Sequence, residues 1–349
     1  MINENHLCRV VSVLSSGYNK SYKSKSLSEI DSLQLTSLDE QGTIMFWSIA
    51  ILSQDTISET DFGLRVGGKV RLIPSGRKNA FGISNTIGRA VDQDSSSMLG
   101  DMEQDVALLS CSRAFCLEIE PTSTSQFLIG IDSGKVMREA RFNKVTPRIY
   151  GYRSRAVKDP TAPLEPLSTC VNCVNYSMFL PEYFVAGYND GTISFFQQGY
   201  PAPLFKLITR NRSSIVDVRW SVTRPCIIFA IDENSCFYII DMLSDKANKL
   251  QEQDVSITLS QGSKTNVSTR ILSLPQAQQQ QRLYKMLSSN KRKNTNITSN
   301  NPSFGIGYED GRFDLHILND ELNVTNPKQE ISQMEAVLKG LFIKNHVDV

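Results

Sequence analysis

The sequence lacks the features that mark most enzymes, membrane proteins and secreted proteins. It has only three histidines, His6, His316 and His346, and no G-x-S-x-G, H-E-x-x-H or G-x-x-x-x-G-K-[ST] motif. Acid–base triads, zinc hydrolysis and nucleotide hydrolysis therefore have little support. No apolar run approaches the ~20 residues that span a bilayer, and the N-terminus lacks the charged region and apolar core of a signal peptide. We expect no enzymatic activity, no cofactor and no membrane insertion.

Strong charge of one sign is also missing. The formal net charge is +1, which gives no overall field to attract nucleic acid or a membrane surface. The basic cluster 291–293 could contact acidic tubulin or nucleic acid. Its Ser- and Asn-rich surroundings favour a solvated loop instead. We therefore expect no nucleic-acid partner.

Cysteine is present in an odd number, seven residues scattered through expected strands. That usage indicates reduced thiols in a cytosolic protein. Cys170 and Cys173 have CxxC spacing, but no second pair or nearby histidine completes a tetrahedral site. On a strand the two side chains would face opposite sides of the sheet. We predict a structural role for both and no metal site.

What the sequence does contain is a repeated hairpin pattern. An apolar run, an acidic or Asn-containing turn and a second apolar run recur along the chain. Glycine stands at the matching turn position in four of them, as Gly42, Gly134, Gly191 and Gly311, because it adopts positive φ without steric cost. Alternating Ile, Phe, Val and Tyr give the period of a half-buried strand. The five segments are Leu33–Ile49, Phe127–Phe142, Tyr183–Phe196, Cys226–Leu243 and Phe304–Leu318.

An additional apolar strand precedes most of these hairpins. The order strand, turn, strand, turn, strand is that of a propeller blade, whereas ordinary hairpins of a β-sandwich are the alternative. The spacing between turns 191 and 235 matches a blade of ~40–45 residues. The upstream strands start at Val10, Ala107, Cys170 and Ser214.

The other spacings are longer, and the excess has the composition of loops. We predict flexible insertions at about 77–103, 143–166 and 245–301, because such polar tracts bury too little apolar area to offset the entropy of ordering. The domain prediction is a WD-repeat propeller portion over 1–325 and a C-terminal helix and tail over 326–349.

The tail has a helical stripe of apolar residues and begins at Pro327, which suits a first helical turn. Two interpretations stay open. The stripe packs on its own propeller, or it offers an apolar face to a partner. The stripe consists of Ile331, Met334, Val337, Leu338 and Leu341.

The predicted fold is thus all-β, a WD-type β-propeller with about five recognisable blades and a C-terminal amphipathic helix. Closed WD rings usually have seven blades, and seven blades of ~40 residues need more chain than the insertions leave. An incomplete ring would expose strand edges. We expect either a longer product of which this is the C-terminal portion, or first blades that are lost or unrecognisable.

Several of these segments resemble the C-terminal propeller of the WD-repeat intermediate chains of dynein. The similarity is greatest to the larger intermediate chain of cytoplasmic dynein 2, the motor of retrograde intraflagellar transport. It covers most of the chain outside the insertions. Ile240 departs from the family, which often has Trp there, and the Gln- and Asn-rich insertion has no counterpart. The matching stretches are LTSLDEQGTIMFWSI followed by DFGLRVGGKVRLIPSG, then FLIGIDSGKVMREARF, WSVTRP with DENSCFYIIDML, and GYEDGRFDLHIL before the terminal helix.

The resemblance implies a non-catalytic scaffold that docks on the tail of a dynein heavy chain, beside a second WD-repeat intermediate chain. It implies a location in the cytoplasm, on the cytoskeleton and in the cilium or flagellum and its base. In this family light chains bind an N-terminal region that is absent here, so light-chain binding is not carried over. The alternative function is a WD-repeat adaptor of another complex, such as a vesicle coat or a ubiquitin-ligase receptor.

Overall fold

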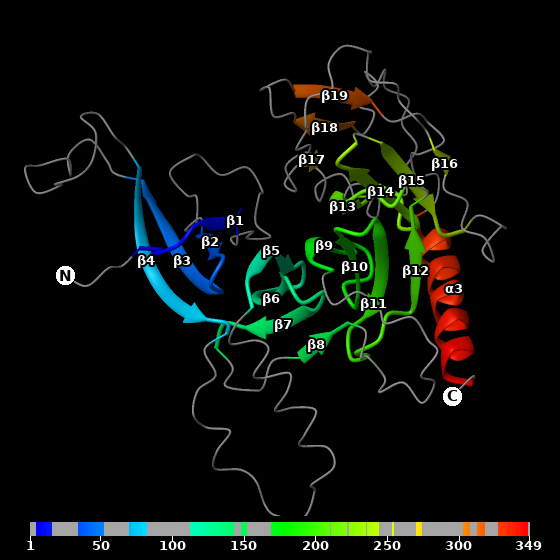
Figure 1. The fold of residues 1–349 in the computed structure, drawn as a ribbon, viewed down its shortest axis with the longest axis horizontal. Helices are drawn as coiled ribbons and strands as arrows, with labels where there is room; N and C mark the ends of the chain where they lie inside the picture. Colours follow the sequence, from blue (N-terminus) through cyan, green and yellow to red (C-terminus); the bar gives the residue numbers. More distant parts are fainter. Residues whose placement is uncertain are drawn as a thin grey trace, which may run out of the picture.

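Five antiparallel β-sheets follow one another along the chain, and one helix ends it (Figure 1). The computed structural model describes residues 5–15, 34–51, 70–81, 112–142, 148–151, 169–243 apart from 210, 222 and 235, 253–254, 270–273, 303–307, 313–317 and 327–347. Sheets 1 to 4 have four strands each and sheet 5 has three, and in every sheet neighbouring strands are neighbours in sequence. This meander is the blade that the sequence predicts.

The element bounds are as follows. Sheet 1 comprises β1 (Val10–Ser15), β2 (Gln34–Asp39), β3 (Thr43–Ile51) and β4 (Val70–Asn79). Sheet 2 comprises β5 (Ala114–Glu120), β6 (Ser123–Ile131), β7 (Val136–Ala140) and β8 (Arg148–Tyr150). Sheet 3 comprises β9 (Val171–Tyr176), β10 (Tyr183–Tyr188), β11 (Thr192–Gln197) and β12 (Phe205–Ile208). Sheet 4 comprises β13 (Ile215–Trp220), β14 (Ile227–Asp232), β15 (Phe237–Asp241) and β16 (Gln253–Asp254). Sheet 5 comprises β17 (Arg270–Ser273), β18 (Ser303–Gly307) and β19 (Phe313–Ile317), and the helix is α3 (Pro327–Val347).

The turns between second and third strands have the predicted chemistry. Gly42, Gly134 and Gly191 have φ of 78°, 72° and 80°, and the backbone N–H of each donates to the carbonyl three residues earlier. A side chain at such φ is strained, so glycine makes these turns tight at little cost. Gly311 lies outside the described residues.

Successive sheets pack face to face through their first strands, because β5 contacts β1, β9 contacts β5 and β13 contacts β9. Figure 1 shows the result as an arc that runs from sheet 1, in blue, round to sheet 5, in orange. The described residues do not close a ring. The prediction of an all-β, propeller-type fold with five blades and a terminal helix is confirmed.

Close approach between sheets requires small residues on the second strands. A Cβ atom added to Gly187 would lie 2.7 Å from Sγ of Cys173 and 2.7 Å from Cγ2 of Ile215, which belongs to the next sheet. No real Cβ tolerates such contacts, so a side chain here would push sheets 3 and 4 apart. The cores between sheets are otherwise filled by large residues, among them Phe127, Phe184 and Phe196, all fully buried.

The boundaries of the predicted insertions need correction. Arg77–Asn79 belong to β4, and Phe81 just beyond it is buried. The strands β8, β16 and β17 also lie inside segments that the sequence analysis assigned to insertions. β8 and β16 are the fourth, outer strands of their sheets, which pair on one side only and therefore have a composition close to that of a loop. β17 is the first strand of sheet 5 and contacts β13, but it is only four residues long and lies within a polar tract. The rest of these insertions lies outside the described residues.

The first strand of the second blade was also misplaced. We expected it at Ala107, but the strand that pairs with β6 is β5, Ala114–Glu120. Its sequence AFCLEIE carries two carboxylates, which weakens its apolar signal. Residues 107–111 lie outside the described residues. The other three upstream strands, at Val10, Cys170 and Ser214, correspond to β1, β9 and β13.

Candidate functional site

A serine, a histidine and an aspartate line up in sheet 1. Oγ of Ser37 lies 2.6 Å from Nε2 of His6, and Nδ1 of His6 lies 3.0 Å from Oδ2 of Asp39. The indole N–H of Trp47 donates to Oγ of Ser37 at 2.7 Å, and the backbone N–H of Thr43 donates to Oδ1 of Asp39 at 2.8 Å. The sequence alone does not indicate a role for His6, because its partners lie about 30 residues away.

This arrangement has the order of a hydrolase triad but the surroundings of a structural network. One histidine tautomer, protonated at Nδ1, satisfies every contact. Its N–H then donates to Asp39, and Nε2 accepts from the hydroxyl of Ser37. That hydroxyl oxygen is buried and already accepts from Trp47, which leaves it poorly placed to attack a substrate. The network ties the segment before β1 to β2 and β3.

Sheet 4 repeats the aspartate with a different partner. Asp232 accepts from the backbone N–H of Cys236 at 2.8 Å and from the hydroxyl of Tyr238 at 2.8 Å. Burial raises the pKa of the Asp232 carboxyl. Asp39 and Asp232 each stand three residues before the turn position, whereas Ile131 and Tyr188 hold that place in sheets 2 and 3.

The aspartates near the other turns are not equivalent to Asp39. Asp132 and Asp190 lie within the turns, one and two positions later than Asp39 does in its own hairpin. Asp190 is exposed and accepts from the backbone N–H of Thr192 at 2.9 Å. Asp310 lies outside the described residues. Turn formation thus explains Asp132 and Asp190, and hairpin anchoring explains the buried Asp39 and Asp232.

A polar cluster joins the first strands of three sheets. Its residues are Glu118 on β5, Asn175 on β9, and Asp217 and Arg219 on β13. The side-chain amide of Asn175 donates to Oε1 of Glu118 at 2.9 Å, and its oxygen accepts from the backbone N–H of Trp220 at 2.7 Å. Arg219 lies 3.8 Å from Glu118 and 3.3 Å from Asp217. The guanidinium thus contacts both carboxylates and offsets their charge.

Burial dominates the electrostatics of this cluster. The pKa of Glu118 is raised from 4.5 to about 7, chiefly by burial and also by the nearby charge of Asp217, while Arg219 and the amide of Asn175 act in the opposite direction. The pKa of Arg219 is raised, chiefly by Asp217. Glu118, Asn175 and Arg219 occupy the same register position on successive sheets. The cluster therefore sets how the three sheets sit against one another.

Stability should fall as pH rises through the range in which Glu118 titrates. An unfolded chain loses this proton near pH 4.5 and the folded chain near pH 7, so the folded state binds more protons between those values. The free energy of unfolding therefore falls as the pH rises from 4.5 to 7, by about 3 kcal/mol in total. Urea unfolding from pH 4.5 to 7.5 should show a weaker decline in Glu118→Gln than in the unaltered chain. Parallel curves for the two proteins would contradict the prediction.

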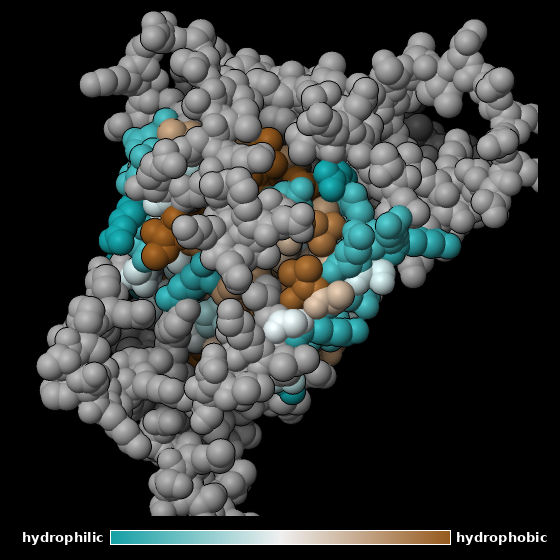
Figure 2. Space-filling model, turned by 90° about the vertical axis from the view of Figure 1, so that its right-hand side faces the viewer, coloured by the Kyte–Doolittle hydropathy of each residue, from teal (hydrophilic) through white to brown (hydrophobic). Residues whose placement is uncertain are grey.

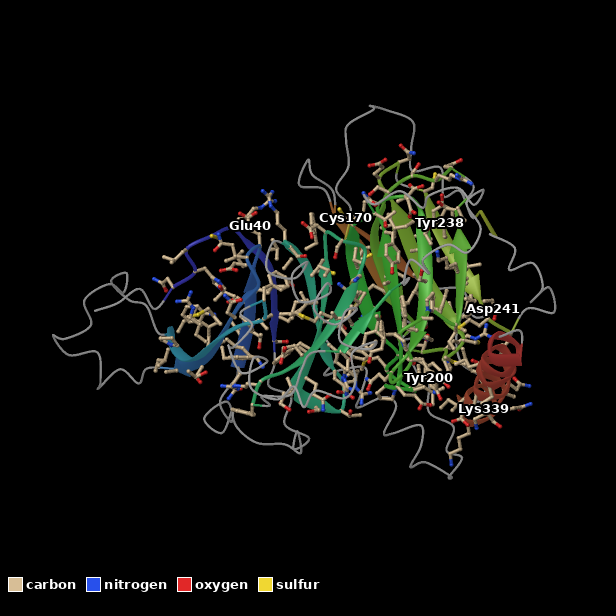
Figure 3. All side chains as sticks on the ribbon, turned by 60° about the horizontal axis from the view of Figure 1, so that its bottom comes forward. Glu40, Cys170, Tyr200, Tyr238, Asp241 and Lys339 are labelled. Carbon is tan, nitrogen blue, oxygen red and sulfur yellow. The ribbon has the colours of Figure 1, made fainter. Side chains whose placement is uncertain are left out.

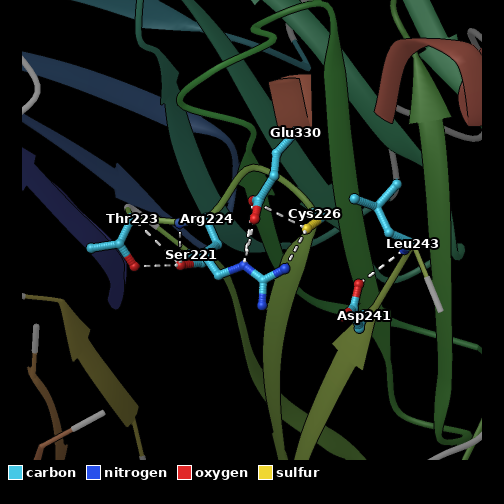
Figure 4. A network of polar contacts seen from close by, with 7 residues as sticks. All are labelled: Ser221, Thr223, Arg224, Cys226, Asp241, Leu243 and Glu330. Atoms are coloured by element: carbon cyan, nitrogen blue, oxygen red, sulfur yellow. Dashed lines mark hydrogen bonds and ion pairs between the residues drawn. The ribbon is translucent and has the colours of Figure 1, made fainter. Parts of the chain in front are cut away.

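The helix α3 is clamped to sheet 4 by an ion pair (Figure 4). Nε of Arg224 lies 3.0 and 3.3 Å from the two carboxylate oxygens of Glu330. The thiol of Cys226 lies 3.5 Å from both the guanidinium and this carboxylate. Oγ of Ser221 accepts from the backbone N–H of Arg224 at 3.1 Å, which holds the turn that carries the arginine. The turn in the W-S-V-T-R-P stretch therefore positions the arginine that binds α3.

Apolar contacts complete the attachment of α3. Met334 and Leu338 are fully buried in the core shared by sheets 3 and 4, and Ile331 and Val337 are partly buried. Of the two interpretations, the structure supports packing of the stripe on the chain's own propeller. The side chain of Leu341 lies outside the described residues.

Two opposite ends of the strands are available for other contacts. Glu40 and Cys170 lie at the end that carries the hairpin turns, and Tyr200 and Lys339 lie at the end that carries α3 (Figure 3). On the side that carries α3, hydrophobic residues show between hydrophilic ones (Figure 2). No single described patch there identifies a docking site.

The described residues contain no cluster of three or more potential metal ligands. Cys173 is buried and Cys170 half-buried, and both are free thiols. Among the described helices, none is long and apolar enough to cross a membrane. The Gly67-Gly68-Lys69 stretch lies outside the described residues.

Comparison with known proteins gives a distant relationship. No family model matches the chain. The crystal structure of Chaetomium thermophilum Raptor superimposes with a TM-score of 0.47 at 13% identity, over 89% of this chain and 20% of that one. Over 229 residues, 64% of this chain, the sequence is 24% identical to cytoplasmic dynein 2 intermediate chain 1 of Mus musculus and 25% identical to that of Homo sapiens. The chain spans about a fifth of the length of these curated relatives. It is therefore a distant relative of the intermediate chains of cytoplasmic dynein 2.

Proposed function

We propose that this chain is a non-catalytic scaffold subunit of a dynein motor. In this proposal it docks on the tail of the heavy chain, beside a second WD-repeat intermediate chain, and supports retrograde intraflagellar transport in cilia or flagella. The observation that carries the proposal is the alignment with cytoplasmic dynein 2 intermediate chain 1 over 229 residues. The proposed location is the cytoplasm, on the cytoskeleton, and the cilium or flagellum with its base.

The packing of the sheets suits a scaffold, because contacts between sheets are both apolar and ionic. Lys78 of sheet 1 pairs with Glu139 of sheet 2, and the guanidinium of Arg141 lies 4.1 Å from the centre of the Phe46 ring, across the same boundary. The polar cluster around Arg219 continues these links through sheets 3 and 4. A body held in this way can present its turns and outer strands to a partner without moving its core.

Affinity purification tests this role directly. Tagged chain expressed in a ciliated cell should recover the heavy chain of the retrograde motor, and recovery should be equal with and without ATP, because the chain contacts the tail rather than the motor domain. A matched control is Trp220→Ala, which should lose recovery through loss of the fold. Recovery of coat or ubiquitin-ligase subunits without a dynein subunit would support the alternative adaptor function and contradict the proposal.

Loss of the gene should impair return transport in the cilium. Cargo particles should accumulate at ciliary tips, since outward transport continues while the return motor lacks a properly held tail. Fluorescence imaging of a tagged transport particle measures the ratio of tip to base signal. An unchanged ratio in cells that lack the protein would contradict the proposal, as would a source cell that builds neither cilium nor flagellum.

A further inference from the structure

Polar side chains enter the otherwise apolar core between sheets 2 and 3. Arg138 of β7 is two positions from Val136, and side chains at that spacing share one face of a strand. Val136 packs in the core between these sheets, so Arg138 faces the same interior. Tyr176 of β9 enters that core from sheet 3 and is 1% exposed. Glu120, the last residue of β5, is buried and contacts Arg138.

Part of this polar group is paired within the chain. Nη2 of Arg138 lies 3.4 Å from Oε2 of Glu120 and also donates to the side-chain oxygen of Gln126. Oε1 of Glu120 accepts from the side-chain amide of Gln198, in sheet 3, at 3.4 Å and from the hydroxyl of Thr122 at 3.2 Å. A carboxylate has about four acceptor sites, so Glu120 can accept a further hydrogen bond.

Two buried donors of the group have no hydrogen-bond partner among the described residues. They are the hydroxyl of Tyr176 and Nε of Arg138. The pKa of Tyr176 is raised chiefly by burial and then by the charge of Glu120, while Arg138 acts in the opposite direction. Both charged groups therefore lie near the hydroxyl. Buried donors in proteins are almost always paired, with protein or with ordered water, because an unmade hydrogen bond lowers stability.

The surrounding charges decide which small ligand suits these two donors. Glu120 and Arg138 form an ion pair, so their charges largely cancel, and neither a cation nor an anion gains a net attraction. A neutral molecule that both donates and accepts hydrogen bonds fits the group. We propose that one ordered water molecule binds here, where it accepts from Arg138 Nε–H and Tyr176 O–H and donates to Glu120. A buried water typically makes about three such bonds.

The degree of burial favours water over a larger neutral molecule. The ring of Tyr176 meets that of the fully buried Phe184 edge to face, with centroids 6.0 Å apart. A molecule of several atoms would require these packed rings to move. The bound water links β5 and β7 of sheet 2 to β9 of sheet 3, and thus adds a polar joint to an apolar interface. This inference does not depend on the proposed role in a dynein motor.

An atomic-resolution crystal structure of the natural gene product tests the site directly. It should show a peak of the height of a water oxygen, about 2.7–3.2 Å from both Tyr176 Oη and Arg138 Nε. Crystals soaked in bromide should show no anomalous signal at this peak, because the site is not an anion site. A bromide signal would overturn the proposal, and so would a direct hydrogen bond from Tyr176 to Glu120 with no density between them.

Tyr176→Phe tests the site in solution, because it keeps the ring and removes only the hydroxyl. Loss of a water-paired hydroxyl should raise the unfolding equilibrium constant, measured in urea, about fivefold. An unchanged or lower constant would show that the hydroxyl was unpaired and would overturn the proposal. Tyr150→Phe is the matched control. Tyr150 is 1% exposed in the same core, and its hydroxyl accepts from the backbone N–H of Gly199 at 3.4 Å, so this variant should also raise the constant.

Arg138→Lys tests whether the two donors share one water. The variant keeps the positive charge and removes Nε. Because each change removes a partner of the same molecule, the effects of Arg138→Lys and Tyr176→Phe on the unfolding constant should be less than additive in the double variant. Additive effects would show that the hydroxyl and Nε have no common ligand, and would overturn the assignment of a single water.

Discussion

Replacing Trp220 by alanine is expected to lower the free energy of unfolding by about 3–5 kcal/mol. The indole is 3% exposed, and its ring meets that of Phe195 in sheet 3 edge to face, with centroids 6.3 Å apart. Its N–H donates to the carbonyl of Pro225 at 2.6 Å. Truncation would leave a cavity between sheets 3 and 4 and an unpaired buried carbonyl. Urea unfolding followed by far-ultraviolet circular dichroism measures the loss.

Trp220→Phe separates the two contributions. It keeps most of the ring packing and removes only the hydrogen bond to Pro225, which is expected to cost about 1–3 kcal/mol. A loss below about 1 kcal/mol for Trp220→Ala would show that the position is not part of the core, since large-to-small changes in packed interiors cost more.

Replacing Leu338 by aspartate is expected to detach α3 and to destabilise sheets 3 and 4. Leu338 is 1% exposed in the core that Met334 also enters, so the variant would either bury a carboxylate or expose the apolar seat of the helix. The loss of apolar packing alone is worth about 2–5 kcal/mol, and a buried unpaired charge adds to it. Urea unfolding of the whole chain, together with the rate of proteolytic removal of the C-terminus, measures both effects.

Gln333→Asp is the matched control for this change. It places the same side chain on the exposed side of the same helix and should shift stability by no more than about 0.5 kcal/mol. If Leu338→Asp left the free energy of unfolding unchanged and weakened the recovery of a partner in affinity purification, the stripe would face that partner rather than the propeller. If both readouts stayed unchanged, the tail would be dispensable.

The hairpins could be predicted because their signals are local. A glycine at positive φ and alternating apolar residues on either side act within about ten residues, so Gly42, Gly134 and Gly191 marked their turns correctly. The helix from Pro327 was predictable for the same reason. The short strands β8, β16 and β17 were not, because pairing with a neighbouring strand, rather than their own composition, makes them strands.

The contacts that could serve function were the least predictable. His6 gained its role only when the fold brought it to Ser37 and Asp39. Glu118, Asn175 and Arg219 lie far apart in sequence. The strands that carry them have no sequence feature that sets them apart from other first strands. No periodicity or spacing rule links such residues, because their proximity depends on the stacking of one sheet upon the next.

The sequence by itself determined the class of fold, the number of blades, the position of the tight turns and the resemblance to dynein intermediate chains. Each of these depends on short-range chemistry, on turn geometry and on the alternation of side chains along a strand. Only the tertiary structure decided that the apolar stripe of α3 packs on sheets 3 and 4 and that Trp220 is buried while Trp47 is half-buried. The same kind of apolar residue can face a sheet, a helix or solvent, and burial follows from which other surface the fold brings against it.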